Sequence, residues 1–159
     1  MKTLKCGRPT PHSKKTLPAK EIRARLNGYL SKKKLKRSEA RDKILNLIIE
    51  NTEHFRIHDL LMRVQKAYPE IGAATVYRSM TLFLKAEIIR ETLTLESGEK
   101  LFELVVDRHH DHIVCTQCNH VFEFHEKIIE TAQDRLGKKL NFKPVNHKHI
   151  IYADCLYEK

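Results

Sequence analysis

Ten consecutive residues, from His109 to Cys118, constrain this chain more than any other segment. Their sequence, HHDHIVCTQC, holds three histidines and two cysteines, which are metal-ligand residue types, and one carboxylate. If the segment is extended, its side chains alternate between two faces, so His110 and His112 point one way and His109 and Asp111 the other. One strand can therefore supply ligands to two different metal sites, one on each face. Imidazole with carboxylate suits divalent iron, manganese, zinc or nickel. The competing interpretation is a solvated polar loop with exposed histidines.

The two cysteines of this segment, Cys115 and Cys118, form a Cys-x-x-Cys turn. Such a turn can present two thiolates to one tetrahedral zinc ion, which needs four ligands in a structural site. Cys155 is a third candidate ligand, but no cysteine follows it, and Cys6 lies far away in the N-terminal segment. Three outcomes stay open: a site completed by another residue, a loosely occupied site, or no zinc. A redox dithiol is a further alternative, because the thiolate performs both kinds of chemistry.

Other histidines and carboxylates stand at suggestive places along the chain. Taken singly, each is better interpreted as a surface polar residue. Glu103 falls on an expected strand before the histidine cluster and Glu123 on one after it. The others are Glu130 on a later helix, His147 at the start of the last expected strand, and His54 at a helix–helix junction.

The positive charge of the chain is concentrated at its N-terminal end. The net charge is +10, yet residues 1–37 alone carry 13 Lys and Arg and a single acid, Glu21. A segment of this kind is attracted to polyanions, and each phosphate contact releases condensed counterions. The distribution favours contact with DNA over the alternative, a solvated basic tail.

The order of expected elements indicates an α+β fold of two parts. Residues 1–19 form a flexible basic arm containing Pro9, Pro11 and Pro18. Residues 20–106 show a basic helix at 20–30, a helix that Ser38 caps, helices near 57–64 and at 73–85, and strands at 88–95 and 100–106. This is the pattern of a winged helix-turn-helix. Residues 107–159 form a small α/β domain, with expected strands at 110–115, 119–124 and 147–154 and a helix at 126–137.

A DNA-reading signal lies at the start of the helix expected at 73–85. Small residues are followed there by Thr75, Tyr77 and Arg78, and the N-terminal part of the last helix of a helix-turn-helix enters the major groove. Arg78 can donate two hydrogen bonds to guanine, while Tyr77 can touch a thymine methyl group or a phosphate. The alternative is a surface helix that packs on a protein partner.

Several classes of protein fit this sequence poorly. No stretch approaches the roughly 20 apolar residues that span a bilayer, and no apolar core follows the basic N-terminus, so we expect a cytoplasmic protein without membrane contact. A zinc hydrolase or thiol oxidoreductase is the main rival, but neither H-E-x-x-H nor an evident Ser/His/Asp set occurs. A zinc-storage module without a DNA role is a second rival.

From about residue 30 to residue 155 the chain resembles the ferric uptake regulator (Fur) family. The resemblance rests on the segments 74–78 (ATVYR), 102–104 (FEL) and 109–112 (HHDH), on Cys115-x-x-Cys118, and on the spacing to the later Glu, His and Cys residues. It implies an N-terminal winged helix joined to a C-terminal dimerisation domain, a homodimer or tetramer, and repression of iron-uptake genes through a double-stranded DNA operator. Zinc, manganese, nickel and peroxide sensors of the same superfamily are the alternatives. Because peroxide sensors usually carry Asp at the regulatory carboxylate positions, Glu103 and Glu123 favour an iron sensor.

The resemblance also implies site residues. The regulatory site, for Fe(II) or a surrogate such as Zn(II) or Mn(II), corresponds to His54, Glu103, His110, His112 and Glu123. The second metal site corresponds to His109, Asp111, Glu130 and His147. A structural Zn(II) site corresponds to Cys115, Cys118 and Cys155, without the usual fourth cysteine. The DNA-binding residues correspond to Lys36, Arg41, Thr75, Tyr77 and Arg78.

Overall fold

The computed structural model describes residues 17–51, 53–95, 97–105 and 110–156. These residues belong to two compact units, one within 14–107 and the other within 108–159. Most of the expected basic arm, including Cys6, lies outside the described residues, as does His109. The first unit contains α1 (Ala19–Lys32), α2 (Glu39–Glu50), β1 (Phe55–Arg56), α3 (Ile57–Ala67), α4 (Ala73–Lys85), β2 (Ile89–Thr94) and β3 (Lys100–Leu104). The second contains β4 (Asp111–Cys115), β5 (Val121–Phe124), α5 (Lys127–Lys139) and β6 (Ile150–Ala153).

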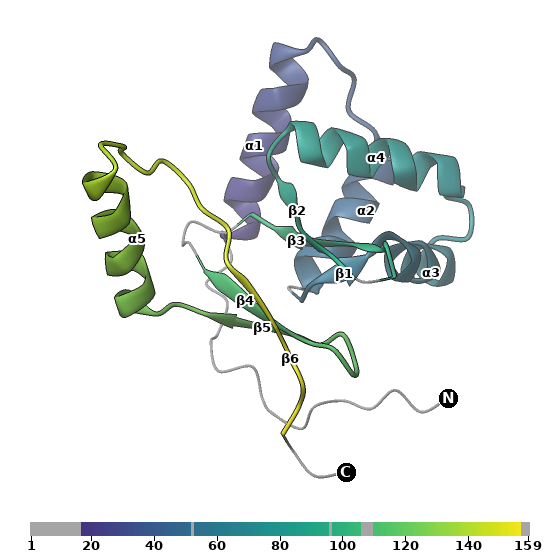
Figure 1. Cartoon of the computed structure of the whole chain (residues 1–159). Coiled ribbons are helices and arrows are strands. Elements are labelled where there is room, and N and C mark those ends of the chain that lie inside the picture. The colour runs from purple at the N-terminus through teal and green to yellow at the C-terminus, as the bar shows by residue number, and fades with distance from the viewer. Residues whose placement is uncertain (1–16, 52, 96, 106–109, 157–159) are drawn as a thin grey trace. The chain divides into compact units, whose positions relative to one another are not determined.

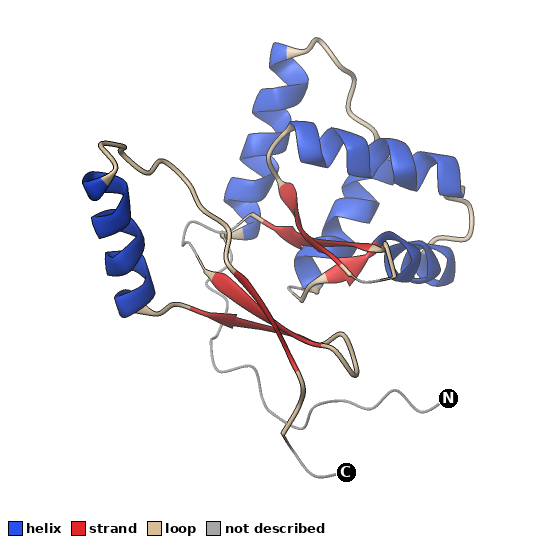
Figure 2. Cartoon of the chain, in the orientation of Figure 1, coloured by secondary structure: helices blue, strands red, loops and turns tan. Residues whose placement is uncertain are grey.

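Helices of the first unit enclose one hydrophobic core (Figures 1 and 2). Apolar residues recur at helical spacing, as in α1, where Ile22, Leu26 and Leu30 are buried one turn apart. Helix α2 packs against α3 and α4, and α4 also contacts β2. Phe83 of α4 is fully buried at the centre of this arrangement. Burying such a side chain stabilises the fold by about 1.5–3 kcal/mol relative to leaving it exposed.

A three-stranded antiparallel sheet with the order β1-β3-β2 completes this unit. The β2–β3 hairpin is the wing of the winged helix, with a register shift between Glu91 and Leu93. Because β3 is the central strand, Glu103 is opposite Arg90 in the register and its side chain is only 2% exposed.

Three helices end in the same hydrogen-bonded turn. After α1, the N–H of Leu35 donates to the carbonyl of Leu30 and that of Lys34 to Ser31. The pair of bonds is the Schellman motif, whose turning residue adopts a left-handed conformation and is usually glycine. Here the turning residues are Lys34 (φ 54°), Glu87 (φ 53°) after α4 and Asn141 (φ 62°) after α5.

The second unit is a three-stranded sheet with the order β5-β4-β6 and the helix α5. Strand β4 pairs antiparallel with β5 and parallel with β6, so the last strand of the chain lies beside the histidine-rich segment. None of the 13 residues of α5 is buried, although the helix carries Ile128 and Leu136.

The expected elements are present, with three differences. Strand β1, which is only two residues long, was not expected from the sequence. Ser38 occupies the N-cap position of α2, but its side chain makes no capping hydrogen bond, so the expectation of a side-chain cap is wrong. The last strand begins at Ile150 rather than at His147, which lies in the preceding coil. Within the described ranges, no helix combines the length and apolar character that a bilayer crossing requires.

Candidate metal centres and DNA-binding surface

Glu103 is the buried carboxylate of the first unit, and two basic side chains hold it. His54, just before β1, places Nε2 3.1 Å from Oε2 of Glu103. Arg90, on the neighbouring strand β2, donates from Nε to Oε1 at 2.7 Å. A buried carboxylate requires such partners, because an uncompensated charge is costly away from water. His54 and Glu103 are thus presented together, as expected of two ligands of one ion, whereas the partner Arg90 was not foreseen.

The other three residues predicted for the regulatory site belong to the second unit, at the paired strands β4 and β5. They are His110, His112 and Glu123. The rings of His110 and His112 lie 5.0 Å apart and nearly perpendicular. His112 is opposite Glu123 in the β4–β5 register, and Nε2 of His110 lies 3.8 Å from Oε1 of Glu123. His110 and His112 therefore share one face of this segment, as its predicted alternation requires.

Asp111 faces a different set of residues. It is fully buried, and its Oδ1 lies 3.7 Å from Nε2 of His147, while Oε1 of Glu130 lies 3.5 Å from that same nitrogen. One ligand atom from each of the three residues lies within 4.8 Å of the others. The predicted second site is thus assembled from β4, α5 and the coil before β6, except for His109, which lies outside the described residues.

The distances between the side chains of Asp111, Glu130 and His147 fit ligation of a shared metal ion better than direct hydrogen bonding. Nitrogen–oxygen hydrogen bonds have lengths of about 2.7–3.2 Å. Two ligands bound about 2.1 Å from one divalent ion are about 3.0–3.4 Å apart at octahedral or tetrahedral angles. The pairs that Nε2 of His147 forms with Glu130 and Asp111, at 3.5 and 3.7 Å, need only small rotations to reach that spacing. Mixed imidazole and carboxylate donors suit iron, zinc, manganese or nickel.

Two further histidines border the Asp111 cluster and were not among the predicted ligands. Nδ1 of His149 lies 4.0 Å from Oδ2 of Asp111, and Nδ1 of His125 lies 3.6 Å from Oε1 of Glu130. His149 follows His147 by two residues, so alternation in an extended segment offered a signal for it. His125 directly follows β5, and nothing in its sequence position pointed to Glu130.

The three cysteines lie at one end of the β5-β4-β6 sheet. Cys115 is the last residue of β4 and is buried, whereas Cys118 and Cys155 are half-buried. Thr116, inside the Cys-x-x-Cys turn, hydrogen-bonds Asp154 beside Cys155. Among the residues that the structure describes, the three thiols do not form a group with all sulfur atoms within 4.8 Å.

Helix α4 presents the predicted DNA-reading residues on its solvent side. Val76 and Met80 are buried, whereas Tyr77 is 50% exposed and Arg78 is also exposed. Nη2 of Arg78 lies 3.4 Å from Oγ1 of Thr75, one turn back along the helix. The helix can therefore offer Tyr77 and Arg78 to a ligand without disturbing the core.

The segment between α1 and α2 supplies a second basic surface. Lys33, Lys34 and Lys36 are all exposed. Arg41 is half-buried and donates to the backbone carbonyl of Lys36 at 3.2 Å. This bond ties the start of α2 to the segment, so Arg41 has a structural contact in addition to the phosphate contact predicted for it.

Comparison with known proteins identifies relatives of the chain. The family model described as "Ferric uptake regulator family" matches residues 32–152. The Ferric uptake regulation protein of Escherichia coli is 36% identical over 130 residues, which are 81% of this chain and 87% of that protein.

Solved structures agree with this finding. The ferric uptake regulator of Vibrio cholerae has a TM-score of 0.69 at 34% identity, over 81% of this chain and 98% of that one. The regulator from Francisella tularensis, solved with iron, has a TM-score of 0.71 at 31% identity, over 77% and 92%.

Proposed function

This chain belongs to the ferric uptake regulator family, and on that premise we propose that it represses iron-uptake genes in response to Fe(II). Family membership confirms the prediction of a metal-responsive transcriptional regulator rather than an enzyme. The observation that carries metal dependence is the burial of Glu103 against His54, a preformed imidazole–carboxylate pair. The choice of iron rests on the similarity to ferric uptake regulation proteins. As a regulator of transcription, the protein would act in the cytoplasm, where operator DNA is accessible.

We assign the sensing metal to His54, Glu103, His110, His112 and Glu123. Two of these residues, His54 and Glu103, belong to the first unit and contact each other. The other three belong to the second unit, where His110 lies close to Glu123. A cation that took ligands from both units would restrain one unit against the other. Metal then stabilises the DNA-binding state by binding it more tightly, which is what a population shift requires.

We assign a second metal ion to Asp111, Glu130 and His147, with His109 as the family resemblance predicts. The fit of the donor atoms around Asp111 supports this assignment. A structural zinc ion on Cys115, Cys118 and Cys155 is the weaker proposal, because three thiolates leave a tetrahedral ion one ligand short.

DNA is the proposed macromolecular partner; a zinc uptake regulator that shares the fold has been solved in complex with zinc and DNA. The exposed Tyr77 and Arg78 of α4 would enter the major groove, with Thr75 beside them. Lys36 would reach the minor groove, and Arg41 a phosphate. The basic segment 1–37 supports the proposal through its attraction to the phosphate backbone.

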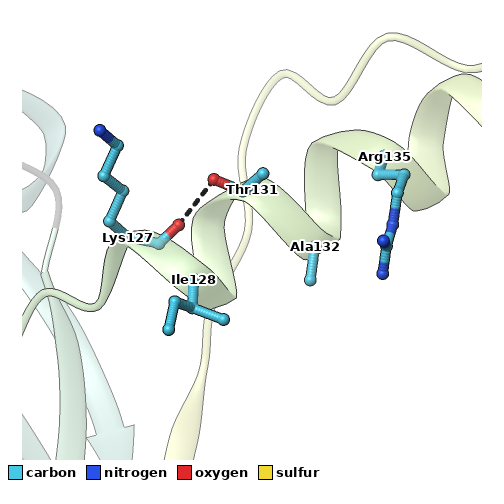
Figure 3. Close-up of a pocket in the computed structure, with 5 residues that line it drawn as sticks. All are labelled: Lys127, Ile128, Thr131, Ala132 and Arg135. Carbon is cyan, nitrogen blue, oxygen red and sulfur yellow. Dashed lines mark hydrogen bonds between the residues drawn. The ribbon is translucent and has the colours of Figure 1, made fainter.

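A second copy of the chain is the proposed protein partner, forming a homodimer and, as the further alternative, a tetramer. Figure 3 shows that Ile128 and Ala132 project from the same side of α5, where they line a surface depression of ≈ 370 Å³ with Lys127, Thr131 and Arg135. Leu136 and Phe142 are 57% and 73% exposed. Apolar side chains gathered in one small unit support burial against an identical surface.

The decisive experiment measures operator binding by the full-length protein with and without Fe(II) under anaerobic conditions. We expect metal to raise operator affinity by at least about 5-fold, the lower end of ordinary allosteric coupling. Mn(II) and Zn(II), added in separate titrations, identify the metal with the largest effect. Equal affinity with and without every metal would contradict the mechanism.

A single substitution separates sensing from folding. His110→Ala should abolish the metal response while the circular dichroism spectrum stays native. His58→Ala is the matched control, because His58 is an exposed histidine on α3. A normal metal response in His110→Ala would remove this residue from the regulatory site.

A further inference from the structure

We infer that His149 is a ligand of the Asp111 metal site and binds the cation through Nδ1. This inference rests on the second metal site proposed above and adds a donor to it. Among the described residues, it gives that site two imidazoles, from His147 and His149, in addition to the carboxylates of Asp111 and Glu130.

Asp111 is positioned between the two histidines. Its Oδ1 lies 3.7 Å from Nε2 of His147, and its Oδ2 lies 4.0 Å from Nδ1 of His149. Each oxygen of this fully buried carboxylate therefore faces a different ring. A cation bound by Asp111 is within reach of both imidazoles after small side-chain rotations.

The Nδ1 atom of His149 is itself buried, although its side chain is 37% exposed. It makes no hydrogen bond within the described part of the chain. Leaving a buried polar atom in this state is unfavourable, because it has given up its hydrogen bonds to water without replacement. A metal ion at the Asp111 carboxylate satisfies the nitrogen without any change of fold.

Both the backbone and the ring of His149 are fixed in this position. The N–H of His112 donates to the carbonyl of His149 at 3.1 Å, at the beginning of the parallel β4–β6 pairing. The ring lies edge-on to Phe124, with centroids 6.1 Å apart and an interplanar angle of 73°. His149 is thus held beside Asp111 by contacts that require no metal, as expected of a preorganised ligand.

The added imidazole changes which metal ions the site binds preferentially. Nitrogen donors favour zinc, cobalt, nickel and ferrous iron, whereas sites rich in carboxylate, carbonyl and water favour magnesium, calcium and manganese. We therefore assign to this site a cation of the first group, such as Zn(II).

The first test measures Zn(II) binding by competition with a chelator, in full-length protein carrying His54→Ala to weaken the regulatory site. When Asp111→Ala is added to this variant, the equivalent of bound zinc that is lost is the one held at the Asp111 site. Adding His149→Phe, which keeps a flat ring without a donor, should weaken that equivalent by at least about 10–100-fold, the loss known for even indirect partners of a metal. His58→Phe is the control, because it removes an exposed histidine of the other unit, and it should leave zinc binding unchanged.

A pair of amide substitutions tests which nitrogen binds. The side-chain oxygen of Asn occupies the position of Nδ1, and that of Gln reaches the position of Nε2. His149→Asn should therefore retain more zinc affinity than His149→Gln. The reverse order would overturn ligation through Nδ1.

A spectroscopic test uses the protein without substitution. With ¹⁵N-labelled histidine and ¹¹³Cd(II) as the probe, a direct bond produces a cadmium–nitrogen scalar coupling at Nδ1 of His149. Coupling at His147 but not at His149 would overturn the inference and leave the second site intact. If Asp111→Ala removes no zinc equivalent, the proposed second site fails as a whole. Coupling at both histidines, with weaker binding in His149→Phe, supports the inference.

Discussion

Arg90 holds one oxygen of the buried Glu103 carboxylate at 2.7 Å, while the other oxygen faces His54. A carboxylate proposed as a metal ligand is therefore neutralised by its own protein before any cation arrives. The Arg90 side chain is 39% exposed, so its guanidinium can move into water if a metal replaces it.

Removing this partner should make folding more dependent on metal. Arg90→Ala leaves Glu103 buried without its closest charge partner, and we expect the metal-free protein to lose about 1–3 kcal/mol of unfolding free energy. Metal should recover part of this loss, because the cation supplies the missing positive charge. The metal-induced rise in Tm should thus be larger in Arg90→Ala than in the unsubstituted protein.

The control for this prediction is Arg56→Ala. Arg56 pairs with Glu99 at 3.4 Å near the surface of the same sheet, so its loss should cost less than about 1 kcal/mol. If the two variants show equal metal-induced shifts in Tm, Arg90 has no part in the metal response.

The turn after α1 offers a way to separate stability from DNA binding. Lys34→Gly should raise the unfolding free energy by about 1 kcal/mol, because glycine adopts the left-handed conformation without steric cost. Glu87→Gly, at the equivalent turn after α4, should give a similar gain. If Lys34 contacts phosphate, only Lys34→Gly weakens operator binding and lowers its dependence on salt concentration. Identical DNA binding by the two variants would show that Lys34 does not contact phosphate.

Arg78 and Lys36 should contribute to DNA binding in different ways. Arg78→Ala should cost about 1–3 kcal/mol on the cognate operator and relax its sequence specificity, because a base contact is lost. Lys36→Ala should reduce the slope of log affinity against log salt by about 1, because a cation held in the minor groove also displaces condensed counterions. Competition between cognate and scrambled duplexes at several salt concentrations distinguishes these outcomes. A uniform loss on all sequences in Arg78→Ala would exclude base reading.

Glu70 should make part of the stability dependent on pH. Its own backbone N–H, and then the Lys43 side chain at 3.1 Å, lower the pKa of Glu70 below the ordinary value of 4.5. A carboxyl group whose pKa is depressed by folding adds stability above its unfolded pKa, and this contribution is lost as pH falls through the folded value. Urea unfolding between pH 6 and about pH 3 should therefore show a smaller acid-side loss in Glu70→Gln than in the unsubstituted protein. Lys43→Met should remove only part of the difference, because the backbone bond remains.

Sequence patterns with strong local causes were the easiest to interpret. The helix expected at 73–85 has those bounds in the structure, because its apolar residues recur at helical spacing between Gly72 and Glu87. Strand β1 carries no local signal, since two residues become a strand only by pairing with β3. The side-chain cap expected from Ser38 also fails, although the residue stands at the correct position.

The proposed metal ligands show the same division between local and long-range information. Alternation along the histidine-rich segment correctly separated Asp111 from His110 and His112. The same pattern gives no information about Arg90, because that side chain reaches Glu103 only through the pairing of β2 with β3. Alternation with His147 offers a local signal for His149, but the parallel pairing of β6 with β4 determines which buried carboxylate it faces.

The parallel pairing of β6 with β4 also determines the stage of synthesis at which the proposed Asp111 site can form. Ribosomes deliver the chain from the N-terminus, so the helices and wing of the first unit emerge before His147, His149 and β6. A nascent chain can thus hold all the helices and strands of the first unit while the proposed Asp111 site still lacks both of these histidines.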